Sequence, residues 1–278
     1  MTDVEQLTPP LAHHGEGPIW DPLVGCLRWV DMLRGDVLTL ATDGNVDRLD
    51  VANVAAAIRP RRGGGLVVAV ERGFALVDSG GGVRRLPEIW DDPTVRMNDG
   101  ACDLQGRFYC GSMAYDEAPG RGSLYCLDPD GSATVVLSGV TISNGLAWTR
   151  DGTEVVYVDT PTGCIDVFAF DPDTGSFSDR RVLAKVDAGR GMPDGIALDE
   201  EGGVWVALWE GGAVHRYLRD GSLDAVLELP VNNVTACALA YGDLFITTSA
   251  VGDPSPAAGA VFRATVGVGG ASIGSFAG

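Results

Sequence analysis

Residues 144–160 read NGLAWTRDGTEVVYVDT: a polar residue beside glycine, a short apolar run, a turn, and then a strand-like segment rich in β-branched and aromatic residues. The layout returns as EGPIWDPLVGCLRWVDM at residues 16–32, NDGACDLQGRFYCGSM at 98–113 and DGIALDEEGGVWVALWEGGAVHRY at 194–217. Weaker copies lie at residues 55–77 and 235–249. Such internal repetition predicts an all-β repeat architecture.

The spacing of the repeats selects one such architecture. Their openings are 40 to 50 residues apart, which is the length of a four-stranded propeller blade, and they fall at Glu16, Ala56, Asn98, Asn144, Asp194 and Ala236. No linker or change of composition interrupts them, so we predict that residues 1–278 form a single six-bladed β-propeller domain. The segment after Val261 is expected to pair with the N-terminal residues and close the ring, and residues 266–278 are expected to fray.

Composition limits the partners of this protein. Lys and Arg total 20 and Asp and Glu total 38, so the net charge of −18 disfavours nucleic acid and anionic substrates and favours a neutral substrate or a cation. The N-terminus lacks the pattern of a signal peptide, and no run of 18 apolar residues predicts a membrane span. The 6 cysteines show no metal-binding spacing and are expected to be mostly buried free thiols. We therefore expect a cytoplasmic protein, monomeric or weakly oligomeric.

The repeat also predicts a functional site. Equivalent positions near the start of each inner strand of a propeller surround the central channel, and here four of them are polar: Glu16, Asn98, Asn144 and Asp194. Carboxylate and amide oxygens suit hard divalent cations, and Glu16 with Asp194 supplies two negative charges. The alternative is that NDG, SNG and PDG are simply turn sequences.

Other chemistries find little support. The chain has no GxSxG, HExxH or Walker motif, and none of its 3 histidines lies at a ring position, so a His-rich zinc site is excluded. His13 and His14 directly precede the first repeat, and whether they reach the pocket stays open.

At these residues the chain resembles the senescence-marker/gluconolactonase family, which includes regucalcin-like proteins and bacterial sugar lactonases. The resemblance covers nearly the whole chain and is carried by GEGPIWDPLVGCLRWVD at residues 15–31, RMNDGACDLQGRFYCGSMAYDEAPGRGSLYCLD at 96–128, ISNGLAWTRDGTEVVYVDT at 142–160, MPDGIALDEEGGVWVAL at 192–208 and VTACALAYGDLFITTSA at 234–250. It implies a six-bladed propeller with one divalent metal in the channel. Calcium is the first candidate for that metal, although Zn²⁺, Mn²⁺ and Fe²⁺ also accept oxygen ligands.

The resemblance also assigns roles to residues. Glu16, Asn144 and Asp194 match the metal ligands, and Asp194 is also the candidate general base. Arg96 and Asn98 match residues that line the substrate pocket. Asp116 lies where the animal members of the family carry an acidic residue, and its side chain is shorter than theirs. Glu117 is the next candidate for this role.

The activity implied is that of a sugar lactonase in carbohydrate metabolism, a hydrolase that opens a small neutral aldonolactone to the aldonic acid. The metal would polarise the lactone carbonyl. Asp194 would either take a proton from the attacking water or orient a hydroxide bound to the metal. Arg96, Asn98 and Asp116 would hold the sugar hydroxyls. Two alternatives remain: a related propeller hydrolase of another ester or a phosphotriester, and a non-catalytic calcium-binding propeller.

Overall fold

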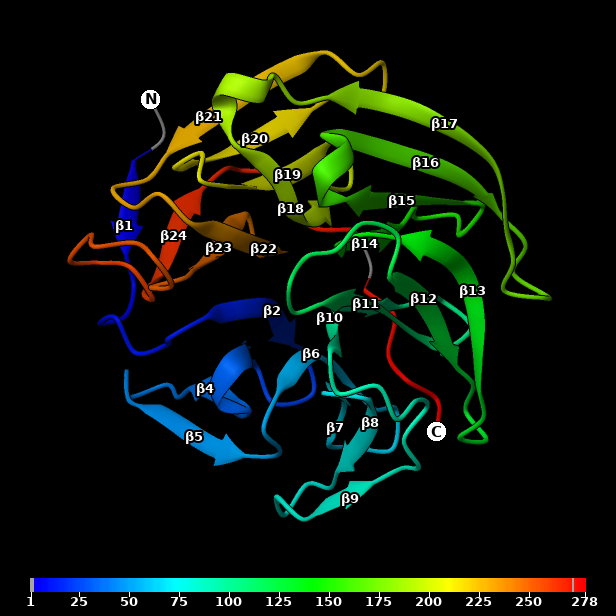
Figure 1. Cartoon of the computed structure of the whole chain (residues 1–278). Helices are drawn as coiled ribbons and strands as arrows, with labels where there is room; N and C mark the ends of the chain where they lie inside the picture. Colours follow the sequence, from blue (N-terminus) through cyan, green and yellow to red (C-terminus); the bar gives the residue numbers. More distant parts are fainter. Residues whose placement is uncertain (1–2, 272) are drawn as a thin grey trace.

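Six four-stranded antiparallel sheets surround a central channel in the computed structural model, which describes residues 3–271 and 273–278. Figure 1 looks along the channel, with strands β2, β6, β10, β14, β18 and β22 innermost. The prediction of an all-β, six-bladed propeller is confirmed. Because each blade is a sheet with an apolar face, only the neighbouring blades bury it, and a closed ring gives every blade two neighbours.

The blades follow the repeats. The first three comprise β2 (Gly15–Asp21), β3 (Cys26–Asp31), β4 (Asp36–Leu40) and β5 (Val46–Asp50); β6 (Ala55–Pro60), β7 (Leu66–Val70), β8 (Gly73–Val77) and β9 (Val83–Arg85); and β10 (Val95–Cys102), β11 (Phe108–Ala114), β12 (Gly122–Leu127) and β13 (Ala133–Val140). The next two comprise β14 (Ser143–Trp148), β15 (Glu154–Asp159), β16 (Cys164–Phe170) and β17 (Phe177–Lys185); and β18 (Met192–Leu198), β19 (Val204–Trp209), β20 (Ala213–Tyr217) and β21 (Leu223–Glu228). Three short 3₁₀ segments are η1 (Met32–Arg34), η2 (Thr160–Thr162) and η3 (Ala188–Arg190).

The sixth blade joins the two ends of the chain. It contains β22 (Val234–Ala240), β23 (Asp243–Thr248) and β24 (Val261–Thr265), and its outer strand is the N-terminal β1 (Val4–Gln6). Strands β1 and β24 pair antiparallel, with Val4 opposite Ala264. The predicted closure is therefore confirmed, and unfolding either end would open the ring.

Each inner strand carries a β-bulge or register shift near its start. The shifts lie between Glu16 and Ile19, Ala55 and Ala57, Met97 and Gly100, Asn144 and Leu146, Pro193 and Ile196, and Val234 and Ala236. The NDG, SNG and PDG triplets thus lie inside strands, and their interpretation as simple turn sequences is wrong. A bulge bends a strand and turns a side chain away from the regular alternation, which is why polar residues can face the channel here.

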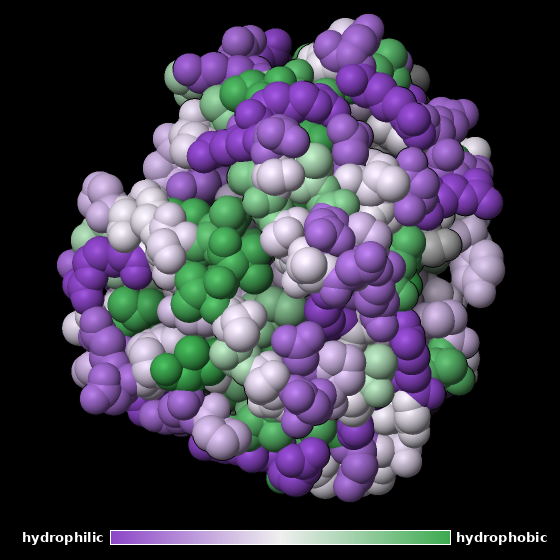
Figure 2. Space-filling view, turned by 90° about the vertical axis from the view of Figure 1, so that its right-hand side faces the viewer, coloured by the Kyte–Doolittle hydropathy of each residue, from purple (hydrophilic) through white to green (hydrophobic). Residues whose placement is uncertain are grey.

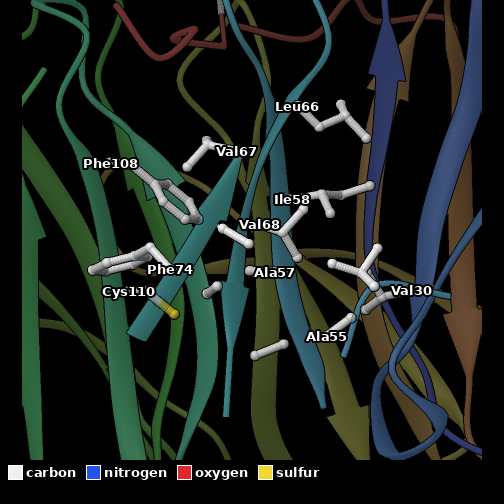
Figure 3. Close-up of a cluster of buried hydrophobic side chains, with 14 of the residues drawn as sticks. Val30, Ala55, Ala57, Ile58, Leu66, Val67, Val68, Phe74, Phe108 and Cys110 are labelled. Carbon is white, nitrogen blue, oxygen red and sulfur yellow. The ribbon is translucent and has the colours of Figure 1, made fainter. Parts of the chain in front are cut away.

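The core lies between the blades. In Figure 3, side chains from β6 and β7 pack between Val30 of the first blade and Phe108 of the third.

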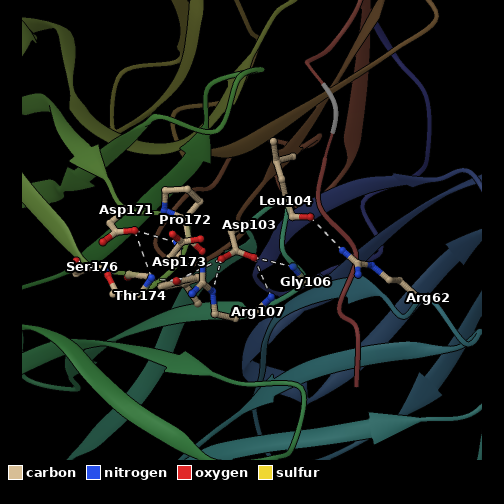
Figure 4. A network of polar contacts seen from close by, with 12 residues as sticks. Arg62, Asp103, Leu104, Gly106, Arg107, Asp171, Pro172, Asp173, Thr174 and Ser176 are labelled. Carbon is tan, nitrogen blue, oxygen red and sulfur yellow. Dashed lines mark hydrogen bonds and ion pairs between the residues drawn. The ribbon is translucent and has the colours of Figure 1, made fainter.

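Polar contacts tie blades together at the ends of the strands. Asp103 accepts hydrogen bonds from the backbone of Gly106 and Arg107, and its carboxylate also pairs with the Arg107 guanidinium (Figure 4). Arg107 in turn donates to the carbonyl of Pro172 in the fourth blade, while Arg62 of the second blade donates to the carbonyl of Leu104. This network links three consecutive blades.

The C-terminal segment crosses one end of the channel, contrary to the expectation that residues 266–278 fray; of these, Ser272 lies outside the described residues. The segment runs behind the ring in Figure 1. Ala271 donates a backbone hydrogen bond to Leu198, and Phe276 donates one to Pro60. Phe276 is also buried in the core of the second blade. Because Leu198 and Pro60 lie at the C-terminal ends of inner strands, the segment covers that end of the channel.

Hydrophilic residues cover most of the side that faces the viewer in Figure 2, with smaller hydrophobic areas between them. The described residues include no helix that is long and apolar enough to span a bilayer. All six cysteines are free thiols, and four of them are buried, which agrees with the expectation from their spacing.

Candidate functional site

A cavity opens at the other end of the channel, where the inner strands begin. Glu16 of β2, Asn98 of β10, Asn144 of β14 and Asp194 of β18 all line it, together with Arg96. The structure therefore brings together five of the six residues that the sequence places in the site. They come from four blades and are up to 178 positions apart in sequence, between Glu16 and Asp194, so only closure of the ring unites them.

The strand register corrects the sequence repeat by one residue in the sixth blade. The shift between Val234 and Ala236 matches the one between Ala55 and Ala57, so Thr235 is the residue equivalent to Ala56. The shift between Met97 and Gly100 matches the one between Pro193 and Ile196, so Asn98 is equivalent to Asp194, as the repeat predicts. Asp99 follows the ring position, and its carboxylate accepts a hydrogen bond from the N–H of Gly100, as that of Glu16 does from the N–H of Gly17. Asp99 is thus a third acidic residue, buried beside the site, whose charge acts on Glu16 and Asp194.

Glycine follows Asn144 and Asp194 because the neighbouring inner strands approach closely there. A Cβ at Gly145 would lie 2.7 Å from the Asp194 carbonyl oxygen, and one at Gly195 would lie 2.4 Å from the Ala236 Cβ. Backbones this close leave no room for a side chain. The glycine of SNG and PDG is thus a packing requirement that sets the distance between neighbouring channel residues.

Two oxygens of the site have no protein partner. Asn144 Oδ1 and Asp194 Oδ1 are both buried without a hydrogen bond among the described residues. The amide nitrogen of Asn144 donates to Thr160 Oγ1 at 3.1 Å, which fixes the amide and leaves its oxygen free. Buried acceptors without a donor are costly, and a cation is the partner that suits an amide and a carboxylate together.

The carboxylates are buried close to one another. Glu16 and Asp194 expose 3% and 5% of their surface. Burial, reinforced by the neighbouring charge of Asp99, raises the pKa of Glu16 to about 8. Burial and then the charges of Glu16 and Asp99 raise the pKa of Asp194 well above its ordinary value. Both pKa shifts reflect the free-energy cost of keeping a negative charge in this buried site. A bound divalent cation would offset that cost.

The residues therefore fit a metal, and the fit depends on the amide. The described residues contain no group of three or more His, Cys, Asp or Glu side chains arranged to hold a metal ion. A cation at this place would be held by Glu16 and Asp194 with the amide oxygen of Asn144 as the third ligand. The two carboxylates supply the charge and Asn144 completes the oxygen set.

Arg96 brings the positive charge of the site. Its Nη1 donates to Asn98 Oδ1 at 2.7 Å and to the Met97 carbonyl at 2.9 Å, and the guanidinium lies over the Tyr115 ring. Burial lowers the pKa of Arg96. Asn98 in turn donates to the carbonyl of Ser143 at 2.9 Å, so both ends of its amide are engaged and it anchors Arg96 against the fourth blade.

The two acidic candidates after β11 differ in position. Asp116 is exposed and accepts a hydrogen bond from the N–H of Ala118, and it is not among the residues that line the cavity. Glu117 lines the cavity and has a positive φ of 56°, a backbone conformation that is uncommon outside glycine. Glu117 is therefore the acidic residue of this loop that borders the cavity.

Sequence reasoning missed part of the cavity wall. Thr160, Met192 and Trp209 line it without having been singled out, and His14, whose reach the sequence left open, lines it as well, whereas His13 does not. The position of His14 beside the GEG opening was the one available signal. Trp209 and Met192 are paired across β18 and β19, a contact that no single-residue pattern reveals.

The fold is a six-bladed propeller, and acidic and amide side chains lie together at one end of its channel. The protein is therefore a β-propeller with a polar site in the mouth of its channel. Within this class, the chain belongs to the SMP-30/gluconolactonase/LRE-like family, whose model matches residues 14–250. The resemblance noted from the sequence is thereby confirmed.

Relatives match along nearly their full length. Pentonolactonase XacC of Haloferax volcanii is 36% identical over 270 residues, which cover 91% of this chain and 90% of that protein. Regucalcin of Danio rerio is 32% identical over 265 residues, covering 90% of each. The structure of regucalcin from Agrobacterium tumefaciens, described as a calcium-binding protein, has a TM-score of 0.92 at 26% identity, covering 99% of this chain and 97% of that one.

The buried carboxylates predict an effect of metal removal on stability. In chelator at about pH 9, Asp194→Asn should raise the melting temperature by roughly 2–6 °C, because it removes an uncompensated buried charge. With calcium added, wild type should gain more than the variant. Differential scanning calorimetry measures both. Asp116→Asn, an exposed carboxylate, is the matched control and should change neither value; a lower melting temperature for Asp194→Asn in chelator would contradict the interpretation.

Proposed function

We propose that this protein is a metal-dependent lactonase that hydrolyses small neutral sugar lactones. The observation that carries the proposal is the pair of buried, unpartnered oxygens on Asn144 and Asp194 beside Glu16, at the floor of a cavity that also contains Arg96. The family and the relation to a pentonolactonase support the choice of reaction. Hard oxygen ligands favour Ca²⁺, and the Agrobacterium relative is described as a calcium-binding protein.

In the proposed hydrolysis, three residues would hold the cation and one of them, Asp194, would also transfer the proton. A divalent cation held by Glu16, Asn144 and Asp194 would polarise the lactone carbonyl and favour negative charge on its oxygen. Asp194 takes the proton from a water molecule whose oxygen bonds to the carbonyl carbon. The bond from that carbon to the ring oxygen then breaks, and the ring oxygen receives the proton from Asp194. The product is the open-chain hydroxy acid.

Arg96 and Glu117 suit the binding of a polyol. Besides Nη1, no guanidinium nitrogen of Arg96 makes a hydrogen bond to the described residues, so donors remain for substrate oxygens. Glu117 provides an acceptor at the rim. Asp116 would reach a substrate only if its loop rearranged, and we therefore assign its expected role to Glu117.

A panel of lactones tests the function. Calcium-loaded protein should hydrolyse gluconolactone, xylonolactone and arabinonolactone faster than 6-phosphogluconolactone, since the net charge is −18 and Arg96 is the only cationic side chain among the residues lining the cavity. Proton release, corrected for spontaneous ring opening, measures the rate. Faster turnover of the phosphorylated lactone would contradict a neutral substrate. Binding of calcium with no hydrolysis of any lactone, ester or phosphotriester would instead favour a calcium-binding protein.

Asp194 and Glu16 should respond differently to neutralisation. Asp194→Asn keeps an oxygen ligand but loses the base, so its turnover at saturating metal should fall by about 10²-fold or more. Glu16→Gln removes ligand charge alone, so excess metal should restore most of its turnover. The measurement is turnover against metal concentration for both variants. Equal rescue of the two would show that Asp194 acts only as a ligand.

A further inference from the structure

His14 is held in the wall of the cavity by contacts to its backbone and its ring. His14 lies in the loop directly before β2, and its backbone N–H donates to Asp31 Oδ1 at 3.0 Å. Its ring lies 5.8 Å from the ring of Trp209, and both residues line the cavity. The side chain thus has a fixed place between the first and fifth blades.

The partners of Ser249 determine which ring nitrogen carries the hydrogen. Ser249 Oγ lies 2.8 Å from His14 Nδ1 and also accepts the N–H of Val251 at 3.1 Å. Ser249 is fully buried, and among the described residues its hydroxyl hydrogen has no acceptor other than His14 Nδ1. Leaving a buried donor unpaired is costly, so the hydroxyl donates to Nδ1 and the hydrogen of the neutral imidazole resides on Nε2.

His14 Nε2 has no hydrogen-bond partner in the described parts of the chain, and it is not among the fully buried, unsatisfied atoms. Since His14 borders the cavity, Nε2–H is a neutral donor available to a ligand. Beside it, Trp209 and Met192 present an apolar surface. A neutral donor next to a flat indole suits a sugar ring, which has hydroxyl oxygens at its edge and C–H groups on its faces.

We propose that His14 is a substrate-binding residue whose Nε2–H donates to a hydroxyl of the sugar lactone while Trp209 packs against the face of its ring. Ser249 is a positioning residue that acts through His14. This inference rests on the proposed lactonase function and adds to it a subsite for the hydroxyl groups, separate from the carboxylates and from Arg96.

The experiment compares four variants as calcium-loaded protein. His14→Leu removes the donor, His14→Gln replaces it with an amide donor, and Ser249→Ala releases the imidazole. His13→Leu is the matched control, because His13 is the exposed neighbour and does not line the cavity. Each is assayed for kcat and KM on xylonolactone and on γ-butyrolactone, which lacks hydroxyls. Calorimetry with the unreactive xylonolactam measures binding, and bound calcium is measured in parallel.

His14→Leu should raise KM for xylonolactone and Kd for the lactam by about 3- to 10-fold, the effect of one neutral hydrogen bond, with kcat and bound calcium nearly unchanged. His14→Gln should recover most of this loss, Ser249→Ala should fall between them, and His13→Leu should equal wild type. The kinetics of γ-butyrolactone should not change in any of the variants.

Three results would overturn the proposal: unchanged KM and Kd in His14→Leu, an equal loss on γ-butyrolactone, or a loss of bound calcium that accounts for the defect. If wild type binds the lactam but hydrolyses no lactone, the lactonase function fails while the lactam affinities still test His14. If wild type does not bind the lactam, the proposal for His14 is itself contradicted.

Discussion

The close approach of the inner strands is the constraint on which the site depends. At Gly145 and Gly195 the neighbouring backbone leaves no space for a Cβ, and the same strands carry the bulges that turn Asn144 and Asp194 toward the channel. The ring therefore sets the spacing of polar groups that four different blades supply. Because closure by β1 and β24 holds the ring together, the geometry of the site depends on a strand pair at its outer edge.

Burying acidic groups in this ring lowers the stability of the free protein and favours the binding of a cation. Burial and the nearby charge of Asp99 make Glu16 and Asp194 harder to ionise, and only Arg96 among the cavity residues carries a positive charge. Ionised, these four groups sum to −2. A site of this kind stores unfavourable electrostatic energy in the free protein that a divalent cation relieves. The C-terminal segment crosses the far end of the channel, while the residues of the site line the cavity at the near end.

The repeats predicted the fold and most of the site because four of the six blades place a polar residue followed by glycine near the bulge, whereas the second blade has only alanines there. They missed Thr235, which lies at the bulge of the sixth blade where the sequence repeat pointed to Ala236. They also did not single out Asp99, which is buried directly after Asn98 and whose charge acts on Glu16 and Asp194. Contacts between blades were also beyond the sequence, including His14 against Trp209 and Ser249. The glycine-rich tail resembles a frayed end, yet Phe276 anchors it in the core.

The central claim is that Glu16, Asn144 and Asp194 hold one divalent cation at the start of the inner strands. A crystal structure of protein grown with calcium, with anomalous scattering measured at a long wavelength, tests it most directly. The account predicts a single strong anomalous peak in contact with oxygens of these three side chains, including the unpartnered Asn144 Oδ1 and Asp194 Oδ1. A peak elsewhere, or none here after loading with calcium, zinc, manganese and iron in turn, would contradict it.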